Sequence, residues 1–244
     1  YAGVTAVFLA YAYIAESETA RRLYMLYKSE PKMKIKDIRS EIEHYAGSLD
    51  MSDEQKDAVF NALSNNVCII TGGPGTGKTT IIKVLLKIME ANGIMTALCA
   101  PTGRAAKRME DSCKKESKTI HRLLEFGYDF EDKEDFYKSG KNKFMRNEEN
   151  PLLTDAIIVD EVSMVDIFLA NALLKAISEG TRVIFVGDAD QLPSVGAGNF
   201  LRDTIKSEFL PVFRLTKFYR QDEGGNIIAN AHRINLGSMP NMYQ

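Results

Sequence analysis

The sequence predicts an α/β fold in which a parallel β-sheet is covered by helices on both faces, with a small helical segment in front of it. After residue 66, short and almost continuously apolar runs recur along the chain, and helical patterns lie between most of them. The first fifty residues show helical spacing instead. Because a strand that is apolar on both sides must be buried on both faces, this alternation favours a parallel sheet between two layers of helices.

Three helices are expected ahead of the first strand. Helical spacing covers residues 6–28 and 34–46, and the second pattern stops at Gly47, a residue type common after helix ends. Ser52, followed three residues later by Gln55, predicts the capped start of a third helix. We expect residues 1–50 to form an N-terminal helical segment, residues 51–225 the main lobe, and residues 226–244 the start of a crossover to a second lobe.

The main lobe is expected to hold five strands, four helices and an insertion at residues 127–149 that is rich in Asp, Glu, Lys and Asn. The expected strands cover residues 67–71, 95–100, 156–160, 183–187 and 212–215. The expected helices cover residues 78–92, 103–114, 119–126 and 165–179.

Composition limits the classes of partner. Hydrophobic residues make up 45% of the 244 residues, and the net charge is −2, so any nucleic-acid contact is expected to be local and groove-like. Cys68, Cys99 and Cys113 lack metal-ligand spacing, which favours free thiols and a cytoplasmic location. The apolar stretch at residues 4–14 is too short to span a bilayer and lacks the basic start of a signal peptide, so no membrane partner is expected.

Residues 72–79, GGPGTGKT, match the phosphate-binding pattern G-x-x-x-x-G-K-[ST] at every fixed position. Glycines allow a turn tight enough for successive N–H groups to face phosphate oxygens, and the helix that follows directs its positive end at the same place. Lys78 is expected to neutralise the β- and γ-phosphates, and Thr79 to ligate Mg²⁺ through its hydroxyl. This is the strongest functional signal in the chain, and it predicts an ATP-binding P-loop.

Two further polar segments directly follow apolar runs. Asp160 is expected to hold Mg²⁺ through its waters, and Glu161 to accept a proton from the attacking water. In the segment at residues 187–194, Gln191 can donate to the γ-phosphate without adding charge.

Each motif has a plainer explanation when taken alone. A glycine-rich turn, a solvated Asp-Glu loop and a cluster of turn residues are all common after strands. Their positions, each after an apolar strand, together favour the phosphate-binding interpretation.

These elements, in this order, resemble superfamily 1 DNA helicases, specifically the RecD/TraA family that includes exodeoxyribonuclease V alpha-chain-like proteins. The resemblance covers nearly the whole chain. The segments that carry it are residues 72–80 (motif I), 100–106 (motif Ia), 119–124, 150–152, 160–164 (motif II), 187–196 (motif III) and 215–221 (motif IV).

The resemblance implies a RecA-like P-loop NTPase lobe that uses ATP and Mg²⁺. The implied nucleotide-binding residues are Gln55, which would read the adenine, and Gly72, Gly73, Pro74, Gly75, Thr76, Gly77, Lys78, Thr79 and Thr80. The implied catalytic residues are Lys78, Asp160, Glu161, Gln191 and Arg220, the last as an arginine finger.

The resemblance also implies a path for single-stranded DNA along Pro101, Thr102 and Arg104. For Arg104 a solvated helix face is the competing interpretation. His121 could couple the ATP and DNA sites or be a half-buried histidine with its bonds satisfied, and the sequence leaves both open.

The function expected on this basis is ATP-driven movement, 5′ to 3′, on single-stranded DNA in recombination or repair, with other subunits of that machinery as further partners. The chain begins with Tyr1 and ends soon after the motif IV-like segment, so we expect it to be part of a longer protein. The alternatives are a nucleotide-gated P-loop assembly module without translocase activity, and an ATPase of another class. The intact Lys78, Asp160, Glu161 and Arg220 argue against the first, and the segment at 100–104 with Gln191 argues against the second.

Overall fold

The computed structural model describes residues 7, 9–47, 49, 51–127, 144–217, 230, 233, 234 and 237–241. Most of the expected insertion at 127–149 and of the segment at 226–244 lies outside these residues, as does Arg220.

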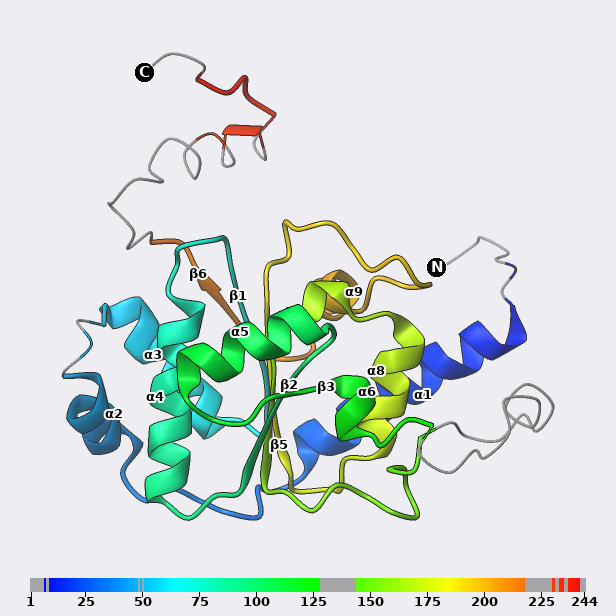
Figure 1. Ribbon diagram of the computed structural model, residues 1–244, viewed down its shortest axis with the longest axis horizontal. Helices are drawn as coiled ribbons and strands as arrows, with labels where there is room; N and C mark the ends of the chain where they lie inside the picture. The colour runs from blue at the N-terminus through cyan, green and yellow to red at the C-terminus, as the bar shows by residue number, and fades with distance from the viewer. Residues whose placement is uncertain are drawn as a thin grey trace.

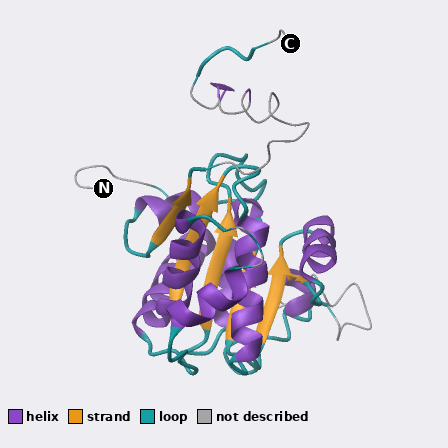
Figure 2. Ribbon diagram, turned by 90° about the vertical axis from the view of Figure 1, so that its left-hand side faces the viewer, coloured by secondary structure: helices purple, strands orange, loops and turns teal. Residues whose placement is uncertain are grey.

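A six-stranded sheet forms the centre of the molecule, and every pairing in it is parallel, which confirms the predicted fold class. Figure 2 shows the strands pointing the same way between two layers of helices. Across the sheet the order is β3 (Lys118–Thr119), β2 (Thr96–Ala100), β4 (Ala156–Val159), β5 (Arg182–Gly187), β1 (Val67–Gly72) and β6 (Val212–Leu215).

The strand order brings the predicted motifs together. β4, β5 and β1 are consecutive in the sheet, and their registers pair Ile157 with Val183 and Ile69 with Phe185. Their carboxyl ends therefore share one edge, although 83 residues (73–155) separate β1 from β4 along the chain. In open α/β sheets this edge is where ligands bind.

Two apolar cores cover the two faces of the sheet. Along β1, Cys68 and Ile70 lie in one core, whereas Val67 and Ile69 lie in the other, as the two-residue period of a strand requires. The first core receives α2 (Ile38–Ala46), α3 (Asp53–Ser64), α4 (Lys78–Ala91) and α5 (Gly103–Cys113). The second receives α1 (Ala10–Lys28), α6 (Ile120–Leu123), α8 (Ile167–Lys175) and α9 (Phe200–Lys206), as Figure 1 allows the reader to follow.

The N-terminal helices lie on opposite faces of this sheet. Leu23 and Leu26 of α1 are buried in the second core beside α8, and Ile42 and Ala46 of α2 are buried in the first. The division of the chain at residue 50 stays a prediction, but both helices contribute apolar side chains to the cores of the lobe.

Several details differ from the sequence-based expectations. The helix expected at 165–179 is shorter, since α8 covers Ile167–Lys175 between its N-cap Asp166 and its C-cap Ala176. The helix expected at 119–126 is only the four residues of α6, because Glu125 adopts a left-handed conformation (φ 54°) and Phe126 enters a bridge with Phe144. β3, which pairs through two residues, and α9, of seven residues, were not predicted because both are too short to produce a periodic pattern. α2 begins later than expected, at Ile38, where the Asp37 side chain accepts a hydrogen bond from the Ser40 amide. Gly47 ends α2 as expected, but its φ of −56° lies in the right-handed helical region and not in the left-handed region common for glycines at helix ends.

Among the helices that the structure describes, none combines the length and the apolar character needed to cross a bilayer.

Candidate functional site

The loop between β1 and α4 has the geometry of a phosphate cradle. Gly75 and Gly77 have φ of 82° and 86°, a left-handed region that side chains other than glycine rarely adopt, and Gly77 caps the start of α4. A Cβ at Gly72 would lie 2.8 Å from Thr76 Oγ1 and 2.9 Å from Leu215 Cβ, so this position also admits only glycine. The Thr76 hydroxyl donates to the Gly73 carbonyl at 2.9 Å and closes the loop.

Gln55 fastens this loop to α3. Its side-chain amide donates to the Thr76 carbonyl at 3.0 Å, and its Oε1 accepts from the Ser52 amide at 3.1 Å in the predicted capping box. The residue is only 3% exposed. Its expected adenine-reading role stays a prediction, and the bonds observed here fix the position of the P-loop relative to α3.

The Lys78 ammonium lies folded back over the loop. It donates to the carbonyl oxygens of Gly72 and Gly73, the second at 2.9 Å. Burial lowers the pKa of Lys78, although nearby carboxylates, that of Asp188 above all, act in the opposite direction. A cation beside the positive end of α4 makes this the natural place for an anion, which fits the expected phosphates.

Asp160 and Glu161 follow β4 at the same edge. Asp160 is 7% exposed, and its amide donates to the Cys99 carbonyl of β2 at 2.9 Å. Burial raises the pKa of the Asp160 carboxyl. The Asp160 carboxylate and the hydroxyl of Thr79, the second residue of α4, are hard oxygen donors of the kind that Mg²⁺ prefers.

Glu161 has a left-handed backbone, with φ of 53°, and caps the short 3₁₀ helix η1 (Val162–Met164). Its carboxylate is ion-paired with the Arg108 guanidinium of α5. Burial has the largest effect on both neighbours, since it lowers the pKa of Lys78 and raises the pKa of Asp160, and the charge of Arg108 is a smaller contribution that acts to lower each pKa. The guanidinium therefore belongs to the same electrostatic site as the P-loop lysine.

The segment after β5 is bonded to its two neighbours in the sheet. Gln191 Oε1 accepts from the Ser163 hydroxyl at 3.2 Å, and the Ala189 amide donates to the Thr71 hydroxyl at 3.1 Å. A Cβ at Gly187 would lie 3.3 Å from the Val162 amide nitrogen, so β5 and η1 approach closely. The three predicted motifs thus form one hydrogen-bonded edge.

A family model described as an AAA domain matches residues 55–197, which include all three motifs. The chain belongs to this family.

Two curated relatives of this AAA domain are RecD proteins by name, and one of them is named as a DNA helicase. The chain is 38% identical over 190 residues to the ATP-dependent RecD2 DNA helicase of Deinococcus radiodurans, an alignment that covers 78% of this chain and 24% of that protein. It is 38% identical over 176 residues to the RecBCD enzyme subunit RecD of Mycobacterium tuberculosis, covering 63% and 28%. The resemblance to RecD helicases is confirmed, and the chain spans about a quarter of the length of these relatives.

The fold of the AAA domain is similar to a solved helicase structure. The crystal structure of Pif1 helicase from Candida albicans matches with a TM-score of 0.55 and 23% identity, covering 79% of this chain and 46% of that one. At this identity the likeness supports the shared fold.

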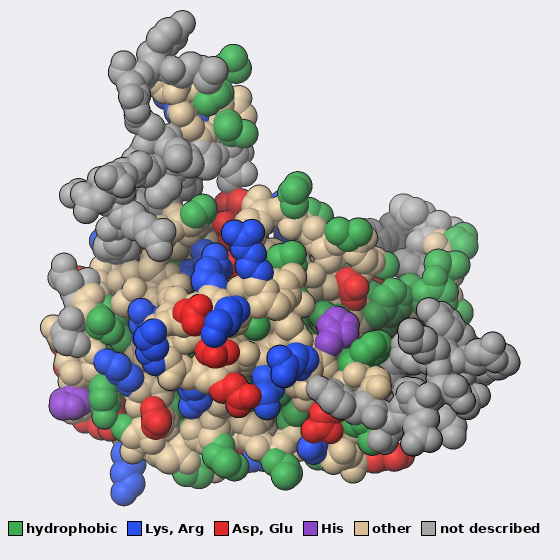
Figure 3. All heavy atoms as spheres, viewed as in Figure 1, with side chains coloured by type: hydrophobic (Ala, Val, Ile, Leu, Met, Phe, Trp, Pro, Cys, Tyr) green, Lys and Arg blue, Asp and Glu red, His purple; other side chains and the backbone are tan. Residues whose placement is uncertain are grey.

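The residues expected along a nucleic-acid strand lie at β2, α5 and α6. Thr102 caps α5, because its hydroxyl accepts from the Ala105 amide at 3.3 Å, and Arg104 is exposed one residue into the helix. The ring of His121 lies 5.4 Å from that of Phe126 and 5.8 Å from that of Phe144, so both interpretations of this residue stay open. Figure 3 shows basic and acidic side chains interspersed over this side of the molecule, with no continuous basic field.

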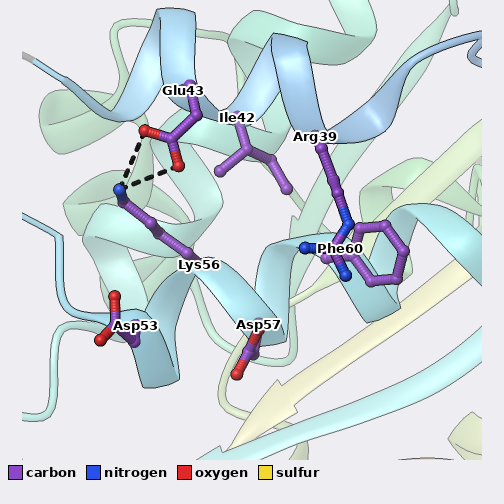
Figure 4. Close-up of a pocket in the computed structure, with 7 residues that line it drawn as sticks. All are labelled: Arg39, Ile42, Glu43, Asp53, Lys56, Asp57 and Phe60. Atoms are coloured by element: carbon purple, nitrogen blue, oxygen red, sulfur yellow. Dashed lines mark hydrogen bonds and ion pairs between the residues drawn. The ribbon is translucent and has the colours of Figure 1, made fainter.

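A separate pocket of about 380 Å³ lies between α2 and α3 (Figure 4). Lys56 donates to both carboxylate oxygens of Glu43 at 3.0 and 3.1 Å. The Arg39 guanidinium lies 4.8 Å from the centre of the Phe60 ring. The contacts of Lys56 with Glu43 and of Arg39 with Phe60 each join α2 to α3, so they are explained by the packing of these two helices.

Arg108 is the site residue that the sequence analysis missed. It lies 53 positions before Glu161, in the same helix as Arg104, which was predicted to contact the nucleic-acid strand. No spacing rule connects the two positions, and only the pairing of β2 with β4 brings α5 beside Glu161.

Proposed function

We propose that this chain is the ATP-hydrolysing motor segment of a DNA helicase that works in recombination or repair and moves 5′ to 3′ on single-stranded DNA. The observation that carries the proposal is the shared edge of the sheet at which β1, β4 and β5 end in the P-loop, in Asp160 and Glu161, and in the segment with Gln191. Hydrogen bonds from Ser163 to Gln191 and from Ala189 to Thr71 join the ends of these three strands. DNA as the substrate is supported by the relative that is named a DNA helicase, and the direction of movement comes from the resemblance to the RecD/TraA family.

The edge suits a nucleoside triphosphate. Gly72 has no room for a side chain, and Gly75 and Gly77 adopt left-handed φ values that other residues rarely adopt. The Lys78 ammonium is held by two loop carbonyls that phosphate oxygens can replace. Thr79 and Asp160 would hold Mg²⁺, which supplies charge neutralisation at the phosphates when bound. In this proposal Gln55 contacts the adenine.

The chemical step assigns a proton to Glu161. The oxygen of a water molecule forms a bond to the γ-phosphorus, and the bond from that phosphorus to the β–γ bridging oxygen breaks. ADP leaves with the electron pair, and the Glu161 carboxylate accepts the proton of the water. Lys78 and Arg220 would stabilise the charge that spreads over the γ-phosphoryl oxygens. Gln191 would lose a hydrogen-bond partner when the γ-phosphate leaves.

The nucleic-acid side of the proposal uses the amino end of α5. Pro101, Thr102 and Arg104 would contact strand phosphates, the last by a charge-assisted hydrogen bond. Other recombination or repair subunits are proposed partners, since one relative is named as a subunit of RecBCD. A cytoplasmic location is proposed because Cys68, Cys99 and Cys113 are all free thiols.

Strand displacement by the full-length protein tests this proposal. Duplexes with a 5′ or a 3′ single-stranded overhang are incubated with Mg-ATP, and the release of the labelled strand is followed. We expect release from the 5′-overhang duplex alone, and none with Lys78→Ala. A protein that binds ATP but releases neither strand would instead be a nucleotide-gated assembly module.

A further inference from the structure

The ion pair between Arg108 and Glu161 joins two parts of the molecule with different expected tasks. Glu161 belongs to the ATP edge, and Arg108 belongs to α5, whose first turn carries the expected strand contacts. The arginine side chain is 64% exposed, whereas that of Glu161 is 15% exposed. The pair therefore connects a solvent-accessible helix face with a mostly buried carboxylate.

The backbone of Glu161 is fixed on both sides. The Asp160 amide is bonded to β2, and Val165 donates to the Val162 carbonyl at 3.0 Å to close η1. The left-handed conformation of a residue other than glycine is unfavourable and persists only where its surroundings hold it. With the backbone held, the direction of the Glu161 carboxylate depends on its side-chain partner, and that partner is Arg108.

α5 is a rigid link between the strand contacts and this pair. Ala105, Ala106 and Met109 are buried in the first core, so Arg104 and Arg108 both lie on the exposed part of the helix. Because they are four residues apart, they are neighbours on one helix face. A strand that contacts Arg104 places its next phosphates within reach of a second guanidinium, which binds phosphate at least as well as carboxylate.

We propose that Arg108 is a positioning residue that holds the Glu161 carboxylate while no nucleic-acid strand is bound and releases it when strand phosphates take the guanidinium. A carboxylate oxygen that is bonded to a guanidinium is occupied and does not accept the proton of the attacking water. Hydrolysis by Glu161 thereby depends on the strand. The inference rests on the proposed function, since it gives that site a means of regulation.

An equilibrium measurement without ATP tests the competition itself. Fluorescence anisotropy gives the Kd of the full-length protein for labelled single-stranded DNA in four forms: wild type, Arg108→Ala, Glu161→Gln and the double variant. Removing the competing carboxylate should tighten strand binding by roughly threefold to tenfold, and this gain should vanish in the Arg108→Ala background. An equal gain in both backgrounds would overturn the proposal, because it would reflect only the lost negative charge.

The matched control lies on the same helix. Lys107 is also 64% exposed and pairs with Glu110 at 3.2 Å. Glu110→Gln removes one negative charge beside the same strand path, and its effect on the Kd should be the same with and without Lys107→Ala. A coupling as large as that of the Arg108 pair would overturn the specific role of Arg108.

Steady-state hydrolysis separates this inference from the proposed function. Arg108→Ala should raise strand-free kcat about threefold or more and reduce the stimulation by DNA, with the KM for ATP nearly unchanged, whereas Arg108→Lys should keep part of the stimulation. Stimulation of hydrolysis by DNA in Arg108→Ala that equals the wild-type stimulation would overturn the positioning role of Arg108 and leave the proposed function untouched. A wild-type protein without any stimulation would sink the proposed function.

Discussion

Two ion pairs involve helices of the first core, and they differ in what surrounds the carboxylate. Between α2 and α3, Glu43 is 68% exposed and its partner Lys56 is 28% exposed (Figure 4). Between α5 and η1 the order is reversed, since Glu161 is 15% exposed and Arg108 is 64% exposed. The first pair adds to the packing of two helices, and the second holds a mostly buried carboxylate beside a P-loop lysine.

The comparison teaches that an ion pair by itself does not mark a site. Exposed pairs contribute about 0–1 kcal/mol to stability, and the Glu43 pair is of this kind. Glu161 differs because its backbone is left-handed and its neighbour Asp160 is a buried carboxyl whose pKa is raised by burial. Strain, burial and several charges at one edge of the sheet together indicate function.

The largest effect is expected from Lys78→Ala. The ammonium is held by two loop carbonyls and stands at the start of α4, so its removal should weaken Mg-ATP binding by roughly tenfold to a hundredfold. Titration with a fluorescent ATP analogue measures this. The control Lys56→Ala, which removes a lysine of the α2–α3 pocket, should bind ATP as wild type does; equal affinity in both variants would refute the P-loop assignment.

Glu161→Gln should bind ATP normally and hydrolyse it roughly 10²- to 10⁴-fold more slowly, because an amide cannot accept the proton of the attacking water. Single-turnover hydrolysis measures the chemical step. Glu43→Gln is the matched change at the exposed pair and should leave that rate unaltered. Near-wild-type hydrolysis by Glu161→Gln would remove this residue from the base role.

Glu54 offers a smaller and pH-dependent effect. Its carboxylate accepts from the Thr216 amide, the Thr216 hydroxyl and the Lys217 amide at 2.9, 2.8 and 3.2 Å, and so ties α3 to the end of β6. Partial burial acts to raise the pKa of Glu54, but these hydrogen bonds outweigh it and the pKa lies below its usual value. Glu54→Gln should lower the free energy of unfolding by about 1 kcal/mol near neutral pH.

The sign of this pH dependence follows from the lowered pKa. A group whose folded-state pKa is depressed stabilises the fold above its unfolded pKa of about 4.3, and this contribution is lost as the pH falls through the folded value. Urea unfolding of wild type and Glu54→Gln should therefore show a difference near neutral pH that shrinks below about pH 4. A difference in the free energy of unfolding that does not change with pH would show that the charge of the Glu54 carboxylate is not what connects α3 to β6.

The smallest effect is expected at the exposed pair. Lys56→Gln should change the free energy of unfolding by less than about 0.5 kcal/mol, since both groups can be solvated by water. Denaturant titration at low and high salt checks this. A decrease of about 2 kcal/mol in the free energy of unfolding would mean that the exposed Glu43–Lys56 pair does not differ in kind from the Glu161–Arg108 pair.

Local patterns made most of the site predictable. Each of three polar segments directly follows an apolar strand: the P-loop, the pair Asp160 and Glu161, and the segment around Gln191. Because parallel strands have their carboxyl ends at the same edge of the sheet, these segments are expected to meet there. The capping box at Ser52 and Gln55 was also correctly predicted. The bond from Gln55 to the Thr76 carbonyl was not, because it depends on how α3 packs against the loop.

Contacts between side chains that are far apart in the sequence could not be predicted. Glu161 and Arg108 meet because β2 lies beside β4, a neighbour relation that no spacing in the sequence specifies. β3 and α9 are held by their surroundings, and neither is long enough to be recognised from periodicity.

The central claim is that ATP hydrolysis at this edge serves movement on a nucleic-acid strand. Steady-state ATP hydrolysis by the full-length protein, titrated with single-stranded DNA, tests it most directly. We expect a rate that rises and saturates with DNA and is abolished in Glu161→Gln. A protein that hydrolyses ATP through Glu161 at a rate independent of DNA would contradict it.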